Sequence, residues 1–482
     1  MDRFKNRVVF EKRLLPINVG NLCEIIGNGY QLENVAPDAL ITCIACETGY
    51  EPLSEGFLLI ERFSDETMVC RIKSGGTAVL TDHKIEGIPC IVVDNVISAV
   101  YNICKWMYEA ISIPAVIVSG GTGKTTTKRM INSFLEKQKN VFSTNKNSNI
   151  LVEFCCHLQS VRTADQITIW EVCENWRRDA ESFSILLKPE IVVVTNIGDS
   201  HLGAIGSKEE QYKCFRALTS GIDKDSIVII NADDEECMQV GFDGNTISIG
   251  INNTSADCVS YNITNTRRGT EFDLRYLNDS VHVKLSVFGI HNVYNAMMAY
   301  VVGVLQGVEK KAILKGLKKY HNVGIRQNII RFGGVVVYAD CYNASAKSIA
   351  SAIKCFCEIP GVHGKRVAVI GDIAEIEGYE EKTYREIAQT IDNSTIDVLL
   401  TYGKDSSMIH DYIRRKIEKK HFTSIDDLNN CLKQMKTERG NGYLFKASRS
   451  IRLERSFRAV FPTHYYSMRA REKYLYRSRL WR

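Results

Sequence analysis

The stretch Ser119–Met130, SGGTGKTTTKRM, follows the apolar run Ile113–Val118, IPAVIV, and indicates the fold of the middle of this chain. A strand that runs into a glycine-rich turn and then a helix is an arrangement that binds phosphate, because backbone N–H groups and the helix N-terminus face the anion. We predict that the turn binds ATP and Mg²⁺ through Gly120, Gly121, Thr122, Gly123, Lys124, Thr125 and Thr126. The usual first glycine is replaced by Val118, so a glycine-rich turn without a ligand stays an alternative.

The segments around this turn have the pattern of a doubly wound sheet. Apolar runs at 167–172, 190–197 and 226–234 alternate with helical stretches, and each run ends in polar residues. Such alternation predicts a mostly parallel sheet that binds its ligands beyond the carboxyl ends of the strands. A stretch with β-type alternation at 270–289 then precedes a long helix.

We therefore expect an α/β protein of three domains. Residues 1–110 form a smaller N-terminal α/β domain that binds substrate, with strands at GFLLI, TAVLT and CIVVD. Residues 111–322 form the central ATP-binding domain, and 323–458 form a second α/β series that predicts a Rossmann-like domain. Residues 459–482 are a basic, aromatic tail.

Composition excludes several classes of protein. Among the 482 residues there is no apolar run of about 18, and the N-terminal sequence lacks the apolar core of a signal peptide. The 16 cysteines are scattered and suit no disulfide framework, which is typical of reduced thiols in the cytoplasm. We expect a cytoplasmic protein without a membrane span, acting as a monomer.

The net charge of +5 comes from the C-terminal end. Eight Lys/Arg and one Glu lie between Arg455 and Arg482, and the rest of the chain is slightly acidic. The body therefore lacks the charge of a nucleic-acid-binding protein. The tail suits RNA, a membrane surface or an acidic partner, or else packs as an amphipathic helix on its own domain.

Polar side chains follow the predicted strands of the central domain. Glu171 closes one strand, His201 follows the next, and Asn231–Asp234 follows a third. A carboxylate and an imidazole beside a phosphate loop suit a divalent cation that neutralises charge during phosphoryl transfer. Asn145 and Asn147 lie in the loop after the first helix of this domain and are candidates for substrate binding.

Nine motifs in order resemble the Mur ligases, over residues 115 to 455: SGGTGKTTTKRM, EVCEN, TNIGDSHLGAIGS, NADD, GIHNVYNAMMA, GIRQN, ADCYNAS, GDIAEIEG and FKASRSIRLE. Within that family they are most similar to the enzymes that add D-alanyl-D-alanine to UDP-N-acetylmuramoyl tripeptide. The resemblance implies a UDP-binding domain, a central ATPase and a C-terminal domain that closes over the site. It also implies peptide-bond formation through an acyl phosphate, with small-molecule substrates.

The resemblance assigns roles to matching positions. Lys124, Glu171 and His201 would be catalytic, and Thr125, Glu171 and His201 would hold Mg²⁺. Asn292 and Asn295 would face the adenine, whereas Arg326 and Asp340 would reach the nucleotide from the third domain. Substrate binding is assigned to Asn145, Asn147, Tyr342, Asn343, Lys446, Ser448 and Arg449.

Three positions depart from the family pattern. The lysine that is usually carbamylated to bind a second metal is replaced by Phe215, and Lys213 lies about 200° away around a helix. The first aspartate of the family's DDSYNAN is Ala339, and its proline-bearing end is Ser345-Ala346. Gly49-Tyr50-Glu51 stands where a triplet that seats the uridine nucleotide is expected.

These departures keep several interpretations open. The chain either joins D-alanyl-D-alanine to the muramoyl tripeptide or joins another carboxylate to another amine. A nucleotide-binding scaffold without turnover is a further alternative. A generic ATPase or kinase with this loop would leave the downstream HNVYN and ADCYNAS motifs unexplained.

Overall fold

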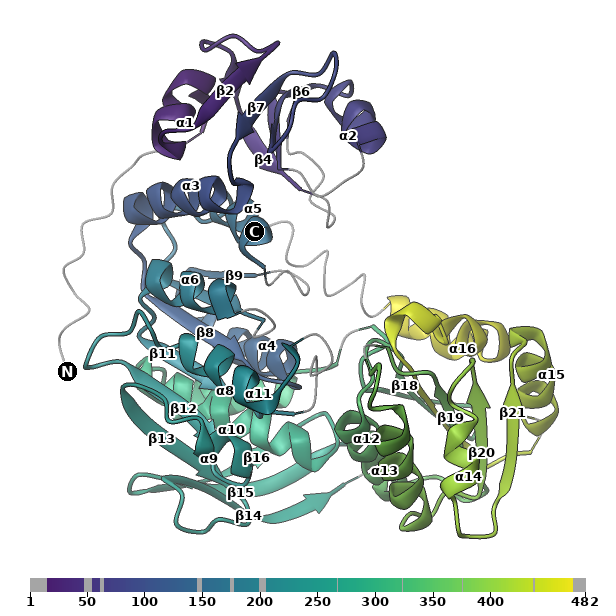
Figure 1. The fold of residues 1–482 in the computed structure, drawn as a ribbon. Coiled ribbons are helices and arrows are strands. Elements are labelled where there is room, and N and C mark those ends of the chain that lie inside the picture. Colours follow the sequence, from purple (N-terminus) through teal and green to yellow (C-terminus); the bar gives the residue numbers. More distant parts are fainter. Residues whose placement is uncertain are drawn as a thin grey trace.

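The computed structural model describes residues 15–46, 54–60, 65–144, 150–173, 177–198, 205–266, 268–322, 324–374, 376–436 and 438–470. Figure 1 shows three sheet-containing parts in chain order, with the largest in the middle. The predicted α/β class with mostly parallel sheets is confirmed.

The central part contains one nine-stranded sheet with the order β16-β15-β14-β13-β12-β11-β8-β10-β9. Its strands from β14 to β9 are parallel, whereas β15 and β16 add an antiparallel edge. The strands are β8 (Ala115–Ser119), β9 (Val141–Ser143), β10 (Ile167–Glu171), β11 (Ile191–Val194), β12 (Ile227–Asn231), β13 (Asn245–Gly250), β14 (Cys258–Asn265), β15 (Thr270–Tyr276) and β16 (Asp279–Lys284). The helices are α4 (Lys124–Leu135), α5 (Leu151–Leu158), α6 (Arg177–Leu187), α8 (Lys208–Ala217), α9 (Glu235–Gln239), α10 (Ile290–Leu305) and α11 (Lys310–Lys319).

Helices cover both faces of this sheet, which explains why its strands β8, β10 and β11 are buried along their whole length. In β8, Ala115 and Ile117 pack with α5, α6 and α8, whereas Val116 and Val118 pack with α4, α10 and α11. The phosphate loop leaves β8, a strand in the interior of the sheet. Ligands of such sheets bind beyond the carboxyl ends of strands like this one.

The C-terminal part has a second, six-stranded sheet with the order β17-β18-β22-β19-β20-β21, in which only the β17–β18 pair is antiparallel. Its strands are β17 (Asn328–Phe332), β18 (Val335–Asp340), β19 (Arg366–Gly371), β20 (Val398–Tyr402), β21 (Glu418–Phe422) and β22 (Gly442–Lys446). Its helices are α12 (Ala346–Glu358), α13 (Glu380–Asp392), α14 (Met408–Tyr412), α15 (Ile425–Met435), the 3₁₀ helix η1 (Arg449–Ile451) and α16 (Glu454–Val460).

The first part of the predicted tail packs on this domain. Residues 462–470 are helical, and Phe461 and Met468 are buried in the core that contains Tyr443 and Phe457. The His464 ring contacts the rings of Phe332 and Phe461. Apolar packing therefore accounts for this segment as far as Met468, and residues 471–482 lie outside the described residues.

The N-terminal part has a five-stranded sheet with the order β2-β7-β6-β5-β4 and a small two-stranded sheet, β1-β3. Its strands are β1 (Ile17–Asn18), β2 (Tyr30–Glu33), β3 (Leu40–Ile41), β4 (Cys43–Ala45), β5 (Phe57–Ile60), β6 (Gly76–Thr81) and β7 (Cys90–Val93). Its helices are α1 (Val19–Ile26), α2 (Asp65–Ile72) and α3 (Val96–Ile111). The predicted strands GFLLI, TAVLT and CIVVD correspond to β5, β6 and β7.

Helix α3 joins the N-terminal part to the central part. Its residues Ile103 and Met107 belong to a core that also contains Val19 of α1 and Phe154 of α5. Figure 1 shows α3 between the two sheets. Gln159 adds a polar link, because its side chain accepts a hydrogen bond from Ile44 N at 2.9 Å and donates one to Ile44 O at 2.7 Å. Over the described residues, the helices are too short or too polar to cross a membrane.

The contact between α4 and α11 provides a test of the packing behind the phosphate loop. A Cβ on Gly316 of α11 would lie 2.7 Å from Phe134 Cβ of α4. Alanine in a helix is ordinarily more stable than glycine by about 1 kcal/mol, but overpacking costs about 1–3 kcal/mol. We expect Gly316→Ala to destabilise the protein by about 1–2 kcal/mol in chemical denaturation. Lys315→Ala, an exposed change on the same helix, should be nearly neutral, and stabilisation by Gly316→Ala would contradict this packing.

Candidate active site

The predicted phosphate loop connects β8 to α4 and has the backbone that its glycines allow. Gly120 and Gly123 have φ angles of 131° and 88°, in the region that favours glycine. Helix α4 begins at Lys124, and no side chain caps its N-terminus. Free N–H groups at the start of a helix bind anions, so the loop can accept a phosphate as predicted. Lys124 Nζ donates to the carbonyl of Gly120 at the edge of the loop.

The chain after β11 forms one wall of the loop. Asn196 accepts hydrogen bonds from Gly121 N at 2.8 Å and, through Oδ1, from Thr122 N at 3.0 Å. The Thr195 hydroxyl donates to Thr122 O. The approach is close, because a Cβ on Gly120 would lie 2.1 Å from Thr195 Oγ1. Thr195 and Asn196 begin the motif TNIGDSHLGAIGS, and the structure shows that they shape the loop.

Glu171, at the end of β10, lies directly beside the loop and is almost fully buried. Its Oε1 accepts a hydrogen bond from Thr125 Oγ1 at 2.8 Å. Its Oε2 lies 2.8 Å from Lys128 Nζ, and both side chains are 2% exposed. Lys128 also donates to Thr144 O at 2.7 Å, at the end of β9.

Each side chain of the buried pair acts on the pKa of the other. Burial raises the pKa of Glu171, but the Lys128 charge and hydrogen bond, the Arg326 charge and the Thr125 hydrogen bond together hold it below its usual value. Burial lowers the pKa of Lys128, and Glu171 opposes that change. Sequence reasoning missed Lys128. Its position four residues after Lys124, one helical turn further, was the available signal.

Among the described residues, Thr125 and Glu171 are the ones that could hold a Mg²⁺ ion bound with nucleotide, although no cluster of three or more His, Cys, Asp or Glu side chains lies there. The Thr125 hydroxyl and a Glu171 carboxylate oxygen are adjacent hard oxygen ligands at the mouth of the phosphate loop, the kind that Mg²⁺ uses together with nucleotide phosphates. Lys128 is paired with Glu171, so most of the negative charge that a Mg²⁺ ion needs would come from the nucleotide phosphates. His201, Asn145 and Asn147 lie outside the described residues.

In α8, Phe215 is buried whereas Lys213 is exposed. Phe215 is fully buried in the core that α6 and α8 share. Lys213 is exposed and pairs with Glu210 at 2.7 Å and Glu209 at 3.4 Å. Lys213 therefore points away from the site, and the position predicted to have lost its lysine holds an aromatic core residue.

Asn292 and Asn295 of α10 are buried, and they bind protein groups. Asn295 Oδ1 accepts a hydrogen bond from Thr127 Oγ1 of α4 at 3.1 Å, and a Cβ on Gly123 would lie 2.5 Å from the same oxygen. Asn292 Nδ2 donates to Phe288 O at 2.7 Å. Asn295 therefore connects α10 to the phosphate loop, whereas Asn292 binds the chain just before α10.

The carboxylates after β12 hold neighbouring loops. Asp233 accepts hydrogen bonds from the N–H groups of residues 251–253 and from Tyr294 OH at 2.6 Å. Asp234 caps α9 through Cys237 N and accepts from Ile197 N. These contacts fix the loop after β11 and the first turns of α10.

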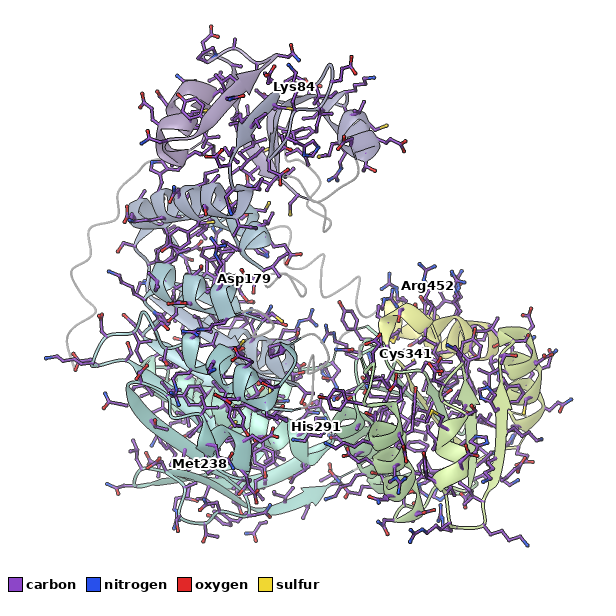
Figure 2. All side chains as sticks on the ribbon, in the orientation of Figure 1. Lys84, Asp179, Met238, His291, Cys341 and Arg452 are labelled. Carbon is purple, nitrogen blue, oxygen red and sulfur yellow. The ribbon has the colours of Figure 1, made fainter. Side chains whose placement is uncertain are left out.

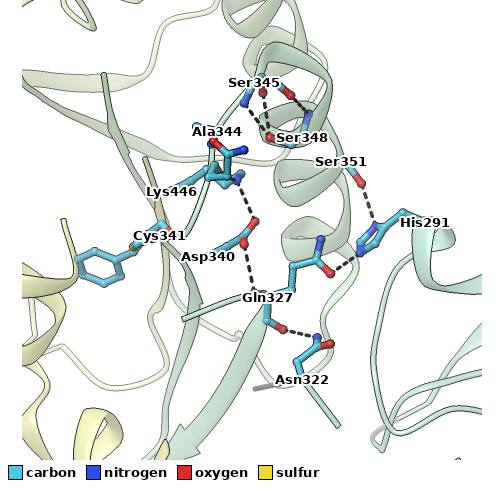
Figure 3. Close-up of polar contacts among 12 residues, drawn as sticks. His291, Asn322, Gln327, Asp340, Cys341, Ala344, Ser345, Ser348, Ser351 and Lys446 are labelled. Atoms are coloured by element: carbon cyan, nitrogen blue, oxygen red, sulfur yellow. Dashed lines mark hydrogen bonds and ion pairs between the residues drawn. The ribbon is translucent and has the colours of Figure 1, made fainter. Parts of the chain in front are cut away.

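In the C-terminal domain, Arg326 and Asp340 lie at the edge that faces the central domain. The Arg326 guanidinium stacks on the Tyr342 ring, 3.6 Å from its centroid. Its charge acts on both Glu171 and Lys128. Asp340 forms a buried ion pair with Lys446 at 3.1 Å. Figure 3 shows this pair continuing through Gln327 to His291 of the central domain.

The other predicted substrate residues of this domain have different surroundings. Ser448 is buried, and its hydroxyl accepts a hydrogen bond from Ala374 N at 2.9 Å. Arg449 is exposed and pairs with Glu454. Asn343 is exposed, and its carbonyl accepts a hydrogen bond from Lys446. Ser448 therefore supports a loop, whereas Asn343 is accessible to a ligand. Figure 2 places Cys341, next to Asp340, on the side of this domain toward the central part.

Comparisons with known proteins agree with the sequence motifs. The family model described as the Mur ligase middle domain matches residues 118–303. A second model, described as the Mur ligase glutamate ligase domain, matches residues 325–449.

Similar full-length proteins share one name, UDP-N-acetylmuramoyl-tripeptide--D-alanyl-D-alanine ligase. The Bacillus subtilis protein is 30% identical over 403 residues, which cover 82% of this chain and 87% of the relative. The Escherichia coli protein is 26% identical and covers 93% of this chain and 99% of the relative. A crystal structure of MurF from Acinetobacter baumannii has a TM-score of 0.81 at 22% identity and covers 93% of this chain and 99% of its own. MurF from Thermotoga maritima in complex with ADP has a TM-score of 0.74 at 19% identity, with coverage of 89% and 98%.

Lys128→Met tests the buried ion pair. Removing one partner of such a pair leaves a buried charge and costs about 3–5 kcal/mol. We expect this loss in the free energy of unfolding of the variant, measured in urea, and we expect Lys128→Met/Glu171→Gln to recover most of it. Lys213→Met, the same change in an exposed pair, should cost less than about 1 kcal/mol. Equal costs for the two single variants would contradict the burial of the pair.

Phe215→Lys tests whether this chain can regain the missing lysine. A charge in this apolar core costs several kcal/mol, so we expect a much lower melting temperature and no gain in phosphate release when bicarbonate is added. Phe215→Leu, which keeps the position apolar, should cost about 1–2 kcal/mol. A stable Phe215→Lys protein with bicarbonate-dependent turnover would show that this position still faces the site.

Proposed function

Because this chain belongs to the Mur ligase family, we propose that it is an ATP-dependent ligase that joins D-alanyl-D-alanine to UDP-N-acetylmuramoyl tripeptide, releasing ADP and phosphate. The observation that carries the proposal is the placement of Thr125 and Glu171 at the phosphate loop, with Arg326 of the next domain acting on the same carboxylate. An enzyme that only hydrolyses ATP would not require a charged residue from a second domain beside the phosphate loop. The proposal includes a cytoplasmic enzyme that acts as a monomer.

The chemistry requires that a carboxylate be activated before an amine attacks it. Phosphoryl transfer from ATP converts the poor leaving oxygen of the carboxylate into a phosphate, and the amine then displaces that phosphate through a tetrahedral intermediate. Negative charge grows at both stages, so fixed cationic groups stabilise both. Thr125 and Glu171 would hold the Mg²⁺ that binds with ATP, and that ion would supply part of the compensating positive charge.

Different residues of the chain bind the phosphates, orient the Glu171 carboxylate and add positive charge. The N–H groups at the start of α4 and the Lys124 amine bind the terminal phosphates, and Lys124 leaves the Gly120 carbonyl to do so. Lys128 and Thr125 hold the Glu171 carboxylate in one orientation. Arg326, stacked on Tyr342, adds a positive charge from the C-terminal domain. Closure of that domain keeps water away from the acyl phosphate.

The buried Phe215 favours a ligase of the same type with one metal ion, and the departure at Gly49-Tyr50-Glu51 leaves open a different carboxylate or amine. The described residues supply no carbamylated lysine at this position, since it belongs to the core. Phosphoryl transfer with a single metal ion remains chemically feasible, because Lys124 and Arg326 provide positive charge. A nucleotide-binding scaffold without turnover would share the same phosphate loop.

Phosphate release by the purified protein distinguishes these candidates. ATP and Mg²⁺ are supplied with UDP-N-acetylmuramoyl tripeptide and D-alanyl-D-alanine, each acceptor is omitted in turn, and mass spectrometry identifies the joined product. We expect product and phosphate only when both acceptors are present, and a fall of at least about a hundredfold in Lys124→Ala. Binding of ATP without product would exclude these two substrates and direct the search to other carboxylates. Absence of ATP binding would exclude the proposal as a whole.

A further inference from the structure

A continuous chain of hydrogen bonds crosses from the central domain to the C-terminal domain beside Arg326. His291, in the first turn of α10, lies 2.9 Å from Gln327 Oε1 through Nε2 and 2.8 Å from Ser351 Oγ of α12 through Nδ1. Gln327 follows Arg326 in the segment between α11 and β17. Figure 3 shows His291 reaching both partners from the opposite side of the domain boundary. One imidazole thus touches two separate elements of the neighbouring domain.

The backbone at Gln327 is held in a conformation that a residue with a side chain rarely adopts. Its φ angle is 49°, which costs about 1 kcal/mol or more for a residue other than glycine. Three hydrogen bonds hold this turn. Gln327 N donates to Asp340 Oδ1 at 3.1 Å, Gln327 O accepts from Asn322 Nδ2 at 2.7 Å, and the side chain binds His291. Such strain persists where the surroundings over-determine it.

The turn sets the direction of the preceding residue. Arg326 leaves the segment toward the Tyr342 ring, on which its guanidinium stacks, and the Ile325 carbonyl accepts a hydrogen bond from Cys341 N at 2.9 Å. Asp340, which binds Gln327 N, is itself fixed by the buried Lys446. The strand end 340–342 and the turn at Gln327 therefore enclose Arg326 from both sides.

The helix that carries His291 also touches the phosphate loop. Asn295, one helical turn after His291, binds Thr127 of α4 and lies against Gly123. The first turns of α10 thus contact the nucleotide loop on one side and the Arg326 segment on the other. A short helix turn is rigid, so displacement at one contact is transmitted to the other.

We propose that His291 and Gln327 are positioning residues for Arg326, and that they couple the phosphate loop to the C-terminal domain through the first turns of α10. With Gln327 Oε1 as acceptor, Nε2 carries the proton and Nδ1 accepts from the Ser351 hydroxyl, as in a neutral imidazole, and Asn292 Nδ2 lies 3.1 Å from the same Nε2. Burial lowers the pKa of His291, which agrees with that form. The inference rests on the nucleotide-binding part of the proposed function and is independent of the acceptor substrates.

The test is the binding of a non-hydrolysable ATP analogue with Mg²⁺ to the full chain, measured by calorimetry. We expect His291→Ala and Gln327→Ala each to weaken binding by about fivefold to tenfold, the usual effect of one hydrogen bond. In the Arg326→Ala background, His291→Ala should add less than about a twofold loss, since a residue that acts through Arg326 has nothing left to position. A full additional loss in that background, or unchanged binding by His291→Ala alone, would overturn the proposal.

Two further variants separate this role from simple support of the fold. Glu358→Ala removes another hydrogen bond between the same domains, from Asn265 Nδ2 at 3.0 Å, that involves neither His291 nor Gln327, and it should leave binding unchanged. Gln327→Gly keeps the turn without strain but lacks the bond to His291, so it should weaken binding as Gln327→Ala does. Normal binding by Gln327→Gly would show that the turn alone suffices and would overturn the role of His291. Failure of the unmodified chain to bind the analogue would instead count against the proposed function.

Discussion

The close approach of two chain segments to the phosphate loop is the constraint on which the rest of this structure depends. A Cβ on Gly120 would lie 2.1 Å from Thr195 Oγ1, and one on Gly123 would lie 2.5 Å from Asn295 Oδ1. The loop after β8 is thus held between the loop after β11 and helix α10. Glycine is required because only a residue without a side chain fits between these groups.

The same packing brings charge to the loop. Glu171 and Lys128 are both withdrawn from water, and burial of this kind is tolerated only when the charges are paired and hydrogen-bonded. Thr125 and Thr144 complete the hydrogen bonds of the pair. The result is a carboxylate of fixed orientation beside the N-terminus of α4, a position that favours anions. Rigid placement of charge is what electrostatic stabilisation of phosphoryl transfer requires.

Helix α10 connects the phosphate loop to the C-terminal domain. Its Asn295 touches the loop, its Tyr294 binds Asp233, and its His291 contacts the segment that carries Arg326. The N-terminal domain is joined through the apolar core that α3 shares with α5. Both boundaries therefore combine polar and apolar contacts: Phe288, just before α10, is buried in the core of the C-terminal domain, and Gln159 hydrogen-bonds Ile44 at the N-terminal boundary.

The sequence by itself determined the α/β class, the phosphate loop and the ordered motifs of the family, because these follow from strand periodicity and from glycines at fixed spacing. It also identified Glu171 and the loss of the lysine at Phe215. Only the tertiary structure showed that Lys128 pairs with Glu171, that Asn292 and Asn295 bind protein groups, and that Ser448 supports a loop. These roles depend on groups that are far apart in the chain, such as Thr127 and Asn295, and local patterns carry no information about which distant side chain meets a polar atom in the core.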